Sequence, residues 1–338
     1  MSPSIQEIAA RVKDLPGPDT ASAERADARD ADLTKPPGAL GRLEAISRWL
    51  AAWQGRYPPG ADDIAALVFA GNHGVTTQGV SPFPAEVTVQ MVANFSAGGA
   101  AINQLCDSVG ATLQVHALDL DRPTADMTEA PALTEDEFAD AFGFGERAVP
   151  EACDLLCLGE MGIGNTTAAA ALAHGLYGGA AADWTGRGTG VDDDGLVRKT
   201  EVVERAVARH RAETDAPLEL FRRLGGRELA AIAGAVLAAR LRRIPVLLDG
   251  FVCCAAAAPL QAANPAALEH CLAAHVSAEQ GHRRLLETMA MTPLLDLGMR
   301  LGEASGAALA AGLVKAACAT HNGMATFAEA GVSEADED

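Results

Sequence analysis

Short apolar runs recur along the chain, and several of them end at a glycine-rich turn. These runs cover residues 64–70, 113–118, 155–158, 244–248 and 272–276. Apolar runs without polar alternation are typical of strands that are buried on both faces of a parallel sheet. Segments with helical spacing lie between them; residues 228–241 are the clearest. Strands that alternate with helices predict an α/β fold, with a Rossmann-like parallel sheet flanked by helices.

Two further segments have weaker patterns. Residues 16–33 are acidic and alanine-rich and specify no element clearly, whereas residues 4–15 can form a short helix. Residues 138–147 have the pattern of an amphipathic connection interrupted by glycines. The acidic residues 334–338 at the end of the chain are expected to fray.

The sequence GEMGIGNTT at residues 159–167 is the most informative motif. It follows an apolar run and precedes an alanine-rich helix, so it predicts a turn at the carboxyl end of a strand, where open α/β sheets bind ligands. Glycines let the backbone approach a ligand, and the free N–H groups of a helix start favour a phosphate. Thr166 and Thr167 add hydroxyl donors. The spacing fits neither a dinucleotide fingerprint nor a Walker P-loop.

Glu160, within this motif, would repel a phosphate, so we expect it to face another part of the ligand. The alternative is a surface glutamate on an ordinary turn. His73, in the glycine turn after residue 70, is interpreted as structural more readily than as catalytic. Asp249 follows the run 244–248 and could reach ribose hydroxyls or simply belong to a turn.

A second glycine cluster, GRGTG at residues 186–190, precedes a helix that carries Lys199. Two glycine loops and one lysine suit a single phosphate. Glu303 lies at or just before the helix expected at residues 307–319, where a capping role is the alternative to a chemical one.

Composition narrows the class of protein. The chain has 338 residues, 49% of them hydrophobic, and a formal net charge of −19. This charge argues against binding to nucleic acids and to anionic membrane surfaces, which both require basic residues. The start of the chain lacks the pattern of a signal peptide, so a cytoplasmic location is expected. The seven cysteines form no Cys-x-x-Cys pair and the histidines show no metal-binding spacing, so no metal is expected.

A set of motifs spreads over residues 35–332. They are KPPGALG at 35–41, GNHGV at 71–75, GEMGIGNTT at 159–167, GRGTG at 186–190, LDGF at 248–251, LGEASGAA at 301–308 and ATFAEAGV at 325–332. Together they resemble the nicotinate-nucleotide–dimethylbenzimidazole phosphoribosyltransferase family, the CobT family of cobalamin biosynthesis. The resemblance implies transfer of phosphoribose from nicotinate mononucleotide to 5,6-dimethylbenzimidazole, which gives α-ribazole 5′-phosphate and nicotinate with inversion at the anomeric carbon.

The resemblance also implies roles for individual residues. Glu303 is the expected catalytic base, and Glu160 is expected at the base-binding pocket. The other residues expected to bind substrate are Ser81, Phe83 and Gln90 at the benzimidazole pocket; Gly162, Gly164, Asn165, Thr166, Thr167, Gly188, Thr189, Gly190 and Lys199 around the phosphate; and Asp249, Ser277, Leu301 and Gly302 near the ligands.

The family further implies a homodimer without metal or organic cofactor. A small helical domain is expected from both chain ends: residues 1–60 as its N-terminal part, 61–310 as the large α/β catalytic domain, and 311–338 as its C-terminal part with the acidic tail. Two alternatives stay open. One is a transferase of the same fold for another acceptor, such as adenine, a different benzimidazole or a phenol; the other is a non-catalytic nucleotide-binding protein.

Two opposite effects act on the pKa of Glu303 and therefore on its strength as a proton acceptor. A helix start lowers the pKa of a carboxyl and weakens it as a base, although the charge still stabilises a positive transition state. Desolvation by a bound aromatic ligand raises the pKa. The sequence does not decide between the two.

Overall fold

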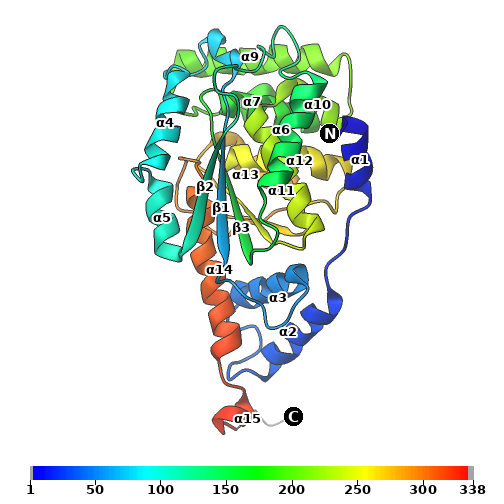
Figure 1. Cartoon of the computed structure of the whole chain (residues 1–338), viewed down its shortest axis with the longest axis vertical. Helices are drawn as coiled ribbons and strands as arrows, with labels where there is room; N and C mark the ends of the chain where they lie inside the picture. The colour runs from blue at the N-terminus through cyan, green and yellow to red at the C-terminus, as the bar shows by residue number, and fades with distance from the viewer. Residues whose placement is uncertain (1–2, 334–338) are drawn as a thin grey trace.

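A parallel sheet of five strands forms the centre of the protein. The computed structural model describes residues 3–333, and its strands are β1 (Ile64–Ala70), β2 (Ala111–Ala117), β3 (Leu155–Met161), β4 (Val246–Leu248) and β5 (Cys271–Ala273). Their order across the sheet is β2-β1-β3-β4-β5, and every pair is parallel. The expected parallel α/β sheet is therefore confirmed (Figure 1).

Both faces of the sheet are covered, which explains the continuous apolar runs. All seven residues of β1 are buried. Leu67 and Phe69 belong to the core on one face, whereas Ile64, Ala66 and Val68 belong to the core on the other. Because side chains alternate between the faces of a strand, each residue of such a run meets a helix layer.

Two helix layers complete the core (Figure 1). The larger layer consists of α6 (Glu135–Ala148), α7 (Asn165–Tyr177), α8 (Ala181–Trp184), α9 (Asp193–Arg211), α10 (Pro217–Leu224), α11 (Arg227–Leu241), α12 (Phe251–Ala263) and α13 (Gln280–Thr288). The opposite face carries α4 (Glu86–Ser96), α5 (Ala101–Val109) and α14 (Ser305–Gly323), and α3 (Arg42–Gln54) packs on α14 beyond the ends of the strands. A short 3-10 helix, η1 (Gly74–Gln78), follows β1.

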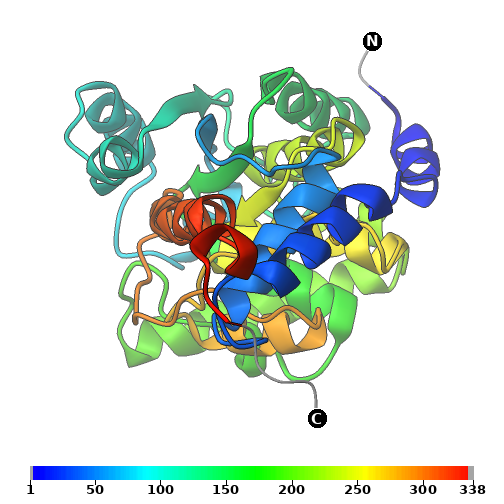
Figure 2. The ribbon, with the colours of Figure 1, turned by 90° about the horizontal axis from the view of Figure 1, so that it is seen from below.

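The two ends of the chain meet beside α3. Helix α2 (Thr20–Asp32) packs on α3, and Leu33 forms an isolated antiparallel bridge with Thr326, just before α15 (Phe327–Ala330). Figure 2 shows α15 lying over these N-terminal helices. Helix α1 (Ile5–Lys13) instead packs against α10 and α12. The domain boundaries at residues 60 and 310 stay predictions, and the expected fraying of residues 334–338 falls outside the described residues.

Several helices differ from the sequence-based expectation. The weakly patterned segment 16–33 contains α2, capped by Asp19. The glycines of residues 138–147 do not interrupt a helix. A Cβ on Gly145 would lie 1.8 Å from the carbonyl oxygen of Ala231, and one on Gly234 would lie 2.0 Å from that of Phe142. These glycines therefore let α6 and α11 touch backbone to backbone.

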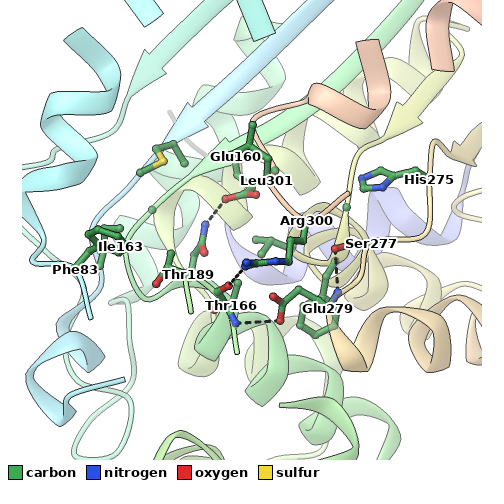
Figure 3. A pocket seen from close by; sticks show the side chains of 18 residues that line it. Phe83, Glu160, Ile163, Thr166, Thr189, His275, Ser277, Glu279, Arg300 and Leu301 are labelled. Atoms are coloured by element: carbon green, nitrogen blue, oxygen red, sulfur yellow. Dashed lines mark hydrogen bonds between the residues drawn. The ribbon is translucent and has the colours of Figure 1, made fainter. Parts of the chain in front are cut away.

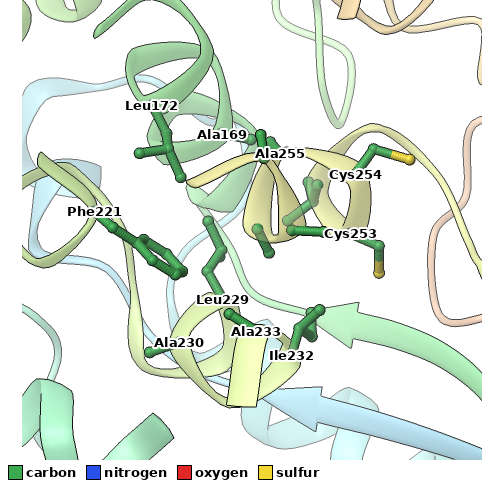
Figure 4. Packing of buried hydrophobic residues seen from close by; sticks show 14 of the residues in the cluster. Ala169, Leu172, Phe221, Leu229, Ala230, Ile232, Ala233, Cys253, Cys254 and Ala255 are labelled. Atoms are coloured by element: carbon green, nitrogen blue, oxygen red, sulfur yellow. The ribbon is translucent and has the colours of Figure 1, made fainter. Parts of the chain in front are cut away.

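Helices α10, α12 and α13 were not expected from the pattern. Residues 251–260 of α12 are all buried, so this helix is apolar on every side and shows no amphipathic period (Figure 4). Across residues 3–333, no helix has the length and apolar character that crossing a membrane requires.

Candidate active site

A cavity of about 270 Å³ opens where β3, β4 and β5 end, at the carboxyl edge of the sheet (Figure 3). We call this space the cavity throughout. Its wall consists of Phe83, Glu160, Met161, Gly162, Ile163, Asn165, Thr166, Gly188, Thr189, Gly250, Phe251, Val252, His275, Ser277, Glu279, Arg300, Leu301 and Gly302.

The turn between β3 and α7 forms one side of the cavity. Gly164 has a φ of 95°, a conformation that favours glycine, and it ends the turn just before α7. The backbone N–H of Ile163 donates to Thr88 Oγ1 of α4 over 3.1 Å. The first turn of α7 then brings Asn165 and Thr166 into the wall, as the sequence predicted.

Basic groups gather at one end of the cavity. Lys199 Nζ donates to Thr166 Oγ1 over 2.7 Å, and Arg300 Nη1 donates to the carbonyl oxygen of Gly188 over 3.0 Å. Burial lowers the pKa of Lys199 to about 8, and the nearby charge of Glu279 opposes that shift. We call Lys199, Thr166, Gly188 and Arg300 the basic end; its donors suit a phosphate.

The segment before α14 forms the opposite end. Gly302, Glu303 and Ala304 follow one another with φ angles of 81°, 63° and 63°. Left-handed backbone at a non-glycine residue costs on the order of 1–3 kcal/mol and persists only where the surroundings enforce it. Here the N–H of Glu303 donates to the carbonyl oxygen of Glu160 over 3.2 Å, which ties the segment to the end of β3. A Cβ on Gly159 would lie 2.1 Å from the nitrogen of Ala304, so only glycine permits this contact.

Three carboxyl groups, Glu160, Glu303 and Asp249, make up what we call the acidic end. Burial, with the charges of Asp249 and Glu228, raises the pKa of Glu160 to about 8, although a hydrogen bond from Asn165 Nδ2 opposes the shift. Burial, with the charge of Asp249, raises the pKa of Glu303 to about 7. Burial and the charge of Asp249 therefore favour the protonated form of Glu303.

The carboxylate at the start of α14 is that of Asp249 and not that of Glu303. It is fully buried, and its Oδ1 accepts a hydrogen bond from the N–H of Ala307, in the first turn of α14, over 3.0 Å. His275 Nε2 lies 3.4 Å from the same oxygen, while Oδ2 has no hydrogen-bond partner within residues 3–333. Asp249 thus fixes α14 from behind the wall.

The structure brings most of the predicted residues together. Those that line the cavity are Phe83, Glu160, Gly162, Asn165, Thr166, Gly188, Thr189, Ser277, Leu301 and Gly302. The others lie outside the wall: Ser81, Gln90, Gly164, Thr167, Gly190, Lys199, Asp249 and Glu303. Ser81 still reaches it, because its Oγ lies 3.2 Å from Thr189 Oγ1. Gln90 lies exposed on α4.

Sequence reasoning missed other wall residues, namely Met161, Ile163, Gly250, Phe251, Val252, His275, Glu279 and Arg300. Met161, Ile163, Gly250 and Phe251 belong to the motifs GEMGIGNTT and LDGF, and each of the others lies within about three residues of a predicted residue. His73 is buried with its Nε2 2.5 Å from Glu228 Oε1, which agrees with the structural interpretation of this histidine.

Comparison with known proteins identifies the family. A phosphoribosyltransferase family model matches residues 15–332. The nicotinate-nucleotide–dimethylbenzimidazole phosphoribosyltransferase of Rhizobium meliloti is 62% identical over 322 residues, which cover 95% of each chain. The protein of the same name from Sinorhizobium medicae is 61% identical over 97% of each chain. The chain belongs to this phosphoribosyltransferase family.

Solved structures agree with this assignment. A crystal structure described as the phosphoribosyltransferase of that name from Thermus thermophilus superposes with a TM-score of 0.86 at 41% identity, covering 94% of this chain and 100% of the other. A structure described as CobT from the same organism gives 0.86 at 42% identity, covering 93% and 100%. The protein is thus an enzyme that transfers a phosphoribosyl group, and the resemblance of its motifs to the family is confirmed.

Proposed function

We propose that this enzyme transfers phosphoribose from nicotinate mononucleotide to 5,6-dimethylbenzimidazole, giving α-ribazole 5′-phosphate and nicotinate in cobalamin biosynthesis. One observation carries the proposal beyond the family name: the cavity is basic at one end and acidic at the other. Lys199 lies against Thr166 at the first, and Glu160 lines the second with Glu303 beside it. A nucleotide with an anionic phosphate and a cationic pyridinium ring fits this polarity.

The acidic end supplies what the reaction needs. A ring nitrogen of the acceptor attacks the anomeric carbon while the bond to nicotinate breaks and nicotinate leaves with the electron pair. The acceptor becomes positive, and the proton on its other nitrogen passes to the Glu303 carboxylate. Glu160 lines the cavity wall beside Glu303, and positive charge on the reacting bases favours its ionised form, which then stabilises that charge.

The basic end holds the substrate during this step. Thr166 and Arg300 offer hydroxyl and charged donors at the cavity wall, and Lys199 adds its charge from behind Thr166. Phosphate bound there places the anomeric carbon at a fixed distance from the acidic end, which converts binding energy into orientation. Phe83 and Leu301 are about half exposed at the wall, at 48% and 55%, and offer apolar surface to the acceptor ring.

To test this proposal, nicotinate release from nicotinate mononucleotide is measured with and without 5,6-dimethylbenzimidazole, and the product is analysed by mass spectrometry. We expect release that depends on the acceptor and a product with the mass of α-ribazole 5′-phosphate. Release only with adenine, another benzimidazole or a phenol would keep the mechanism and change the acceptor. Nucleotide that binds without release would contradict the proposal.

We further propose a cytoplasmic homodimer. All seven cysteines lie within the described residues and are free, as a reducing compartment favours. Val89 of α4 and Phe83 at the cavity wall are 47% and 48% exposed, so apolar side chains are available for an interface. Light scattering coupled to size exclusion tests the dimer: a mass near twice the 34.7 kDa of the chain is expected. The lack of a metal or organic cofactor also stays a prediction.

A further inference from the structure

Glu279 is a carboxylate of the cavity wall to which nothing so far assigns a role. It follows β5 and directly precedes α13, at the N-cap position where an acidic side chain usually accepts a hydrogen bond from its own helix. No such bond forms in α13. The side chain instead points across the cavity toward the loop 186–190 (Figure 3). Helix capping therefore does not explain this residue.

Its surroundings hold the carboxylate in place and leave one oxygen free. Glu279 is 8% exposed, and its Oε2 accepts a hydrogen bond from the N–H of Gly188 over 3.3 Å. A Cβ on Gly186 would lie 2.1 Å from that oxygen, so a side chain at this position would displace the carboxylate from its place. Ser277 Oγ accepts from the N–H of Glu279 over 3.2 Å. Within residues 3–333, Oε1 forms no hydrogen bond, the carboxylate has no ion-pair partner within 4.0 Å, and Glu279 lines the cavity, so this oxygen is available to a ligand.

The chemistry of the donor nucleotide restricts what this oxygen can bind. A phosphate is an acceptor at neutral pH and would be repelled by a carboxylate. The nicotinate ring of the mononucleotide carries a carboxylate and a quaternary nitrogen, and neither donates a hydrogen bond. The ribose 2′- and 3′-hydroxyls are the neutral donors of this molecule, and O–H···O⁻ hydrogen bonds are among the strong ones.

The location of Glu279 agrees with a ribose contact. Its charge acts on Lys199, and its partner Gly188 belongs to the basic end. The ribose ring joins phosphate to base, and its 2′- and 3′-hydroxyls project from one edge of the ring, so a carboxylate next to the phosphate donors is within reach of them. Asp249, the sequence-based candidate for ribose hydroxyls, is fully buried behind the wall and bonded to α14.

On the basis of the proposed function, we propose that Glu279 accepts a hydrogen bond from a ribose hydroxyl of the donor nucleotide and thereby selects ribonucleotide over deoxyribonucleotide. The N–H of Gly188 holds one oxygen, and the ribose hydroxyl takes the other. A deoxynucleotide would leave that oxygen buried without a donor, which is the arrangement that gives strong rejection of an analogue.

The test compares nicotinate mononucleotide with its 2′-deoxy and 3′-deoxy analogues in the wild type, in Glu279→Gln and in the control Glu287→Gln. Glu287 is an exposed glutamate on the same helix. The wild type and the control should prefer the ribonucleotide over one analogue by roughly 10- to 100-fold in kcat/KM. Glu279→Gln should lose about that factor with the ribonucleotide and less than about threefold with the analogue.

Two outcomes would overturn the proposal. Equal losses with all three nucleotides in Glu279→Gln would mean that Glu279 only supports the loop 186–190. The proposal would also be overturned if the wild type preferred the ribonucleotide over both analogues by less than about threefold in kcat/KM. Calorimetric binding of the same three nucleotides separates this proposal from the proposed function. Tighter binding of the ribonucleotide without nicotinate release would keep the ribose contact and overturn the reaction.

Discussion

The two ends of the cavity differ in the partners that surround their buried ionisable groups. At the basic end Lys199 keeps a hydroxyl partner, Thr166 Oγ1 at 2.7 Å, and feels the negative charge of Glu279. At the acidic end the charge of Asp249 raises the pKa of both Glu160 and Glu303. None of these three carboxyl groups forms an ion pair with Lys or Arg in residues 3–333. The basic end is compensated before substrate arrives, whereas the acidic end is not.

This difference indicates what each end does. A compensated cation can bind a phosphate without a large change in structure, so the basic end is suited to ground-state binding. Carboxyl groups with a raised pKa ionise more readily when positive charge appears beside them, as it does on the acceptor ring and the ribose carbon during transfer, and the ionised groups then stabilise that charge. The acidic end is therefore suited to stabilising the transition state.

The largest expected effect is at Glu303. Glu303→Gln keeps the shape of the side chain but removes the charge and the proton-accepting oxygen. We expect kcat to fall roughly 10²- to 10⁴-fold, the usual contribution of a general base, with little change in KM for the nucleotide. Steady-state kinetics of nicotinate release measure both constants.

Glu201→Gln, an exposed glutamate of α9, serves as the control and should match the wild type. Near-normal turnover of Glu303→Gln would remove the base assignment. A rise in KM for the nucleotide with unchanged kcat would instead place Glu303 in binding and erase the distinction between the two ends.

The next effect is at the basic end, where Lys199→Met removes a buried charge while keeping most of the volume. The variant should raise KM for nicotinate mononucleotide by about 10- to 100-fold, because it loses a charged hydrogen-bond donor, and should change kcat far less. Lys13→Met, an exposed lysine on α1, is the matched control. A fall in kcat at constant KM would show that the basic end also acts on the transition state.

The sequence located parts of the cavity wall better than it predicted the surrounding helices, and the chemical roles of these residues stay predictions. The motif 159–167 and the pair Leu301–Gly302 mark the wall correctly, because glycine turns at strand ends leave a recognisable signal. Glu279 and Arg300 carry no such signal, since a charged residue in a loop is normally solvated. Their roles depend on the packing of the loop 186–190 against the end of β5, which is a tertiary contact.

Tertiary contacts also limited what the sequence predicted about the fold. The strands followed from apolar runs, but α12 is apolar on all sides and the glycines of α6 serve helix contact, so periodicity and glycine content misled there. The role of Asp249 was also beyond reach, because its bond to Ala307 joins residues 58 positions apart.

A smaller effect is the pH dependence of the acidic end. The pKa of Glu303 is raised to about 7, and only its ionised form accepts a proton. The value of kcat/KM for the acceptor should therefore rise about tenfold per pH unit below 7 and level off above it. Dimethylbenzimidazole also titrates, so its neutral fraction at each pH is measured by absorbance and the rate constant is divided by that fraction. A midpoint near the ordinary glutamate value of 4.5 would mean that the carboxylate is solvated in the working enzyme.

The smallest effect is on stability, and it uses the same Glu303→Gln variant. Because the pKa of Glu303 is raised from 4.5 to about 7 in the folded state, the folded protein holds this proton more tightly than the unfolded chain. The stabilisation from this group is complete below pH 4.5 and is lost as pH rises through 7. Glutamine does not titrate. As the pH rises through this range, the free energy of unfolding of the variant should therefore increase relative to that of the wild type, by about 1–3 kcal/mol.

Denaturant unfolding of both proteins at about pH 5 and about pH 8, on either side of the raised pKa, measures the difference. A difference that stays constant with pH would show that burial does not penalise the charge at the acidic end, and the two ends would then differ only in sign.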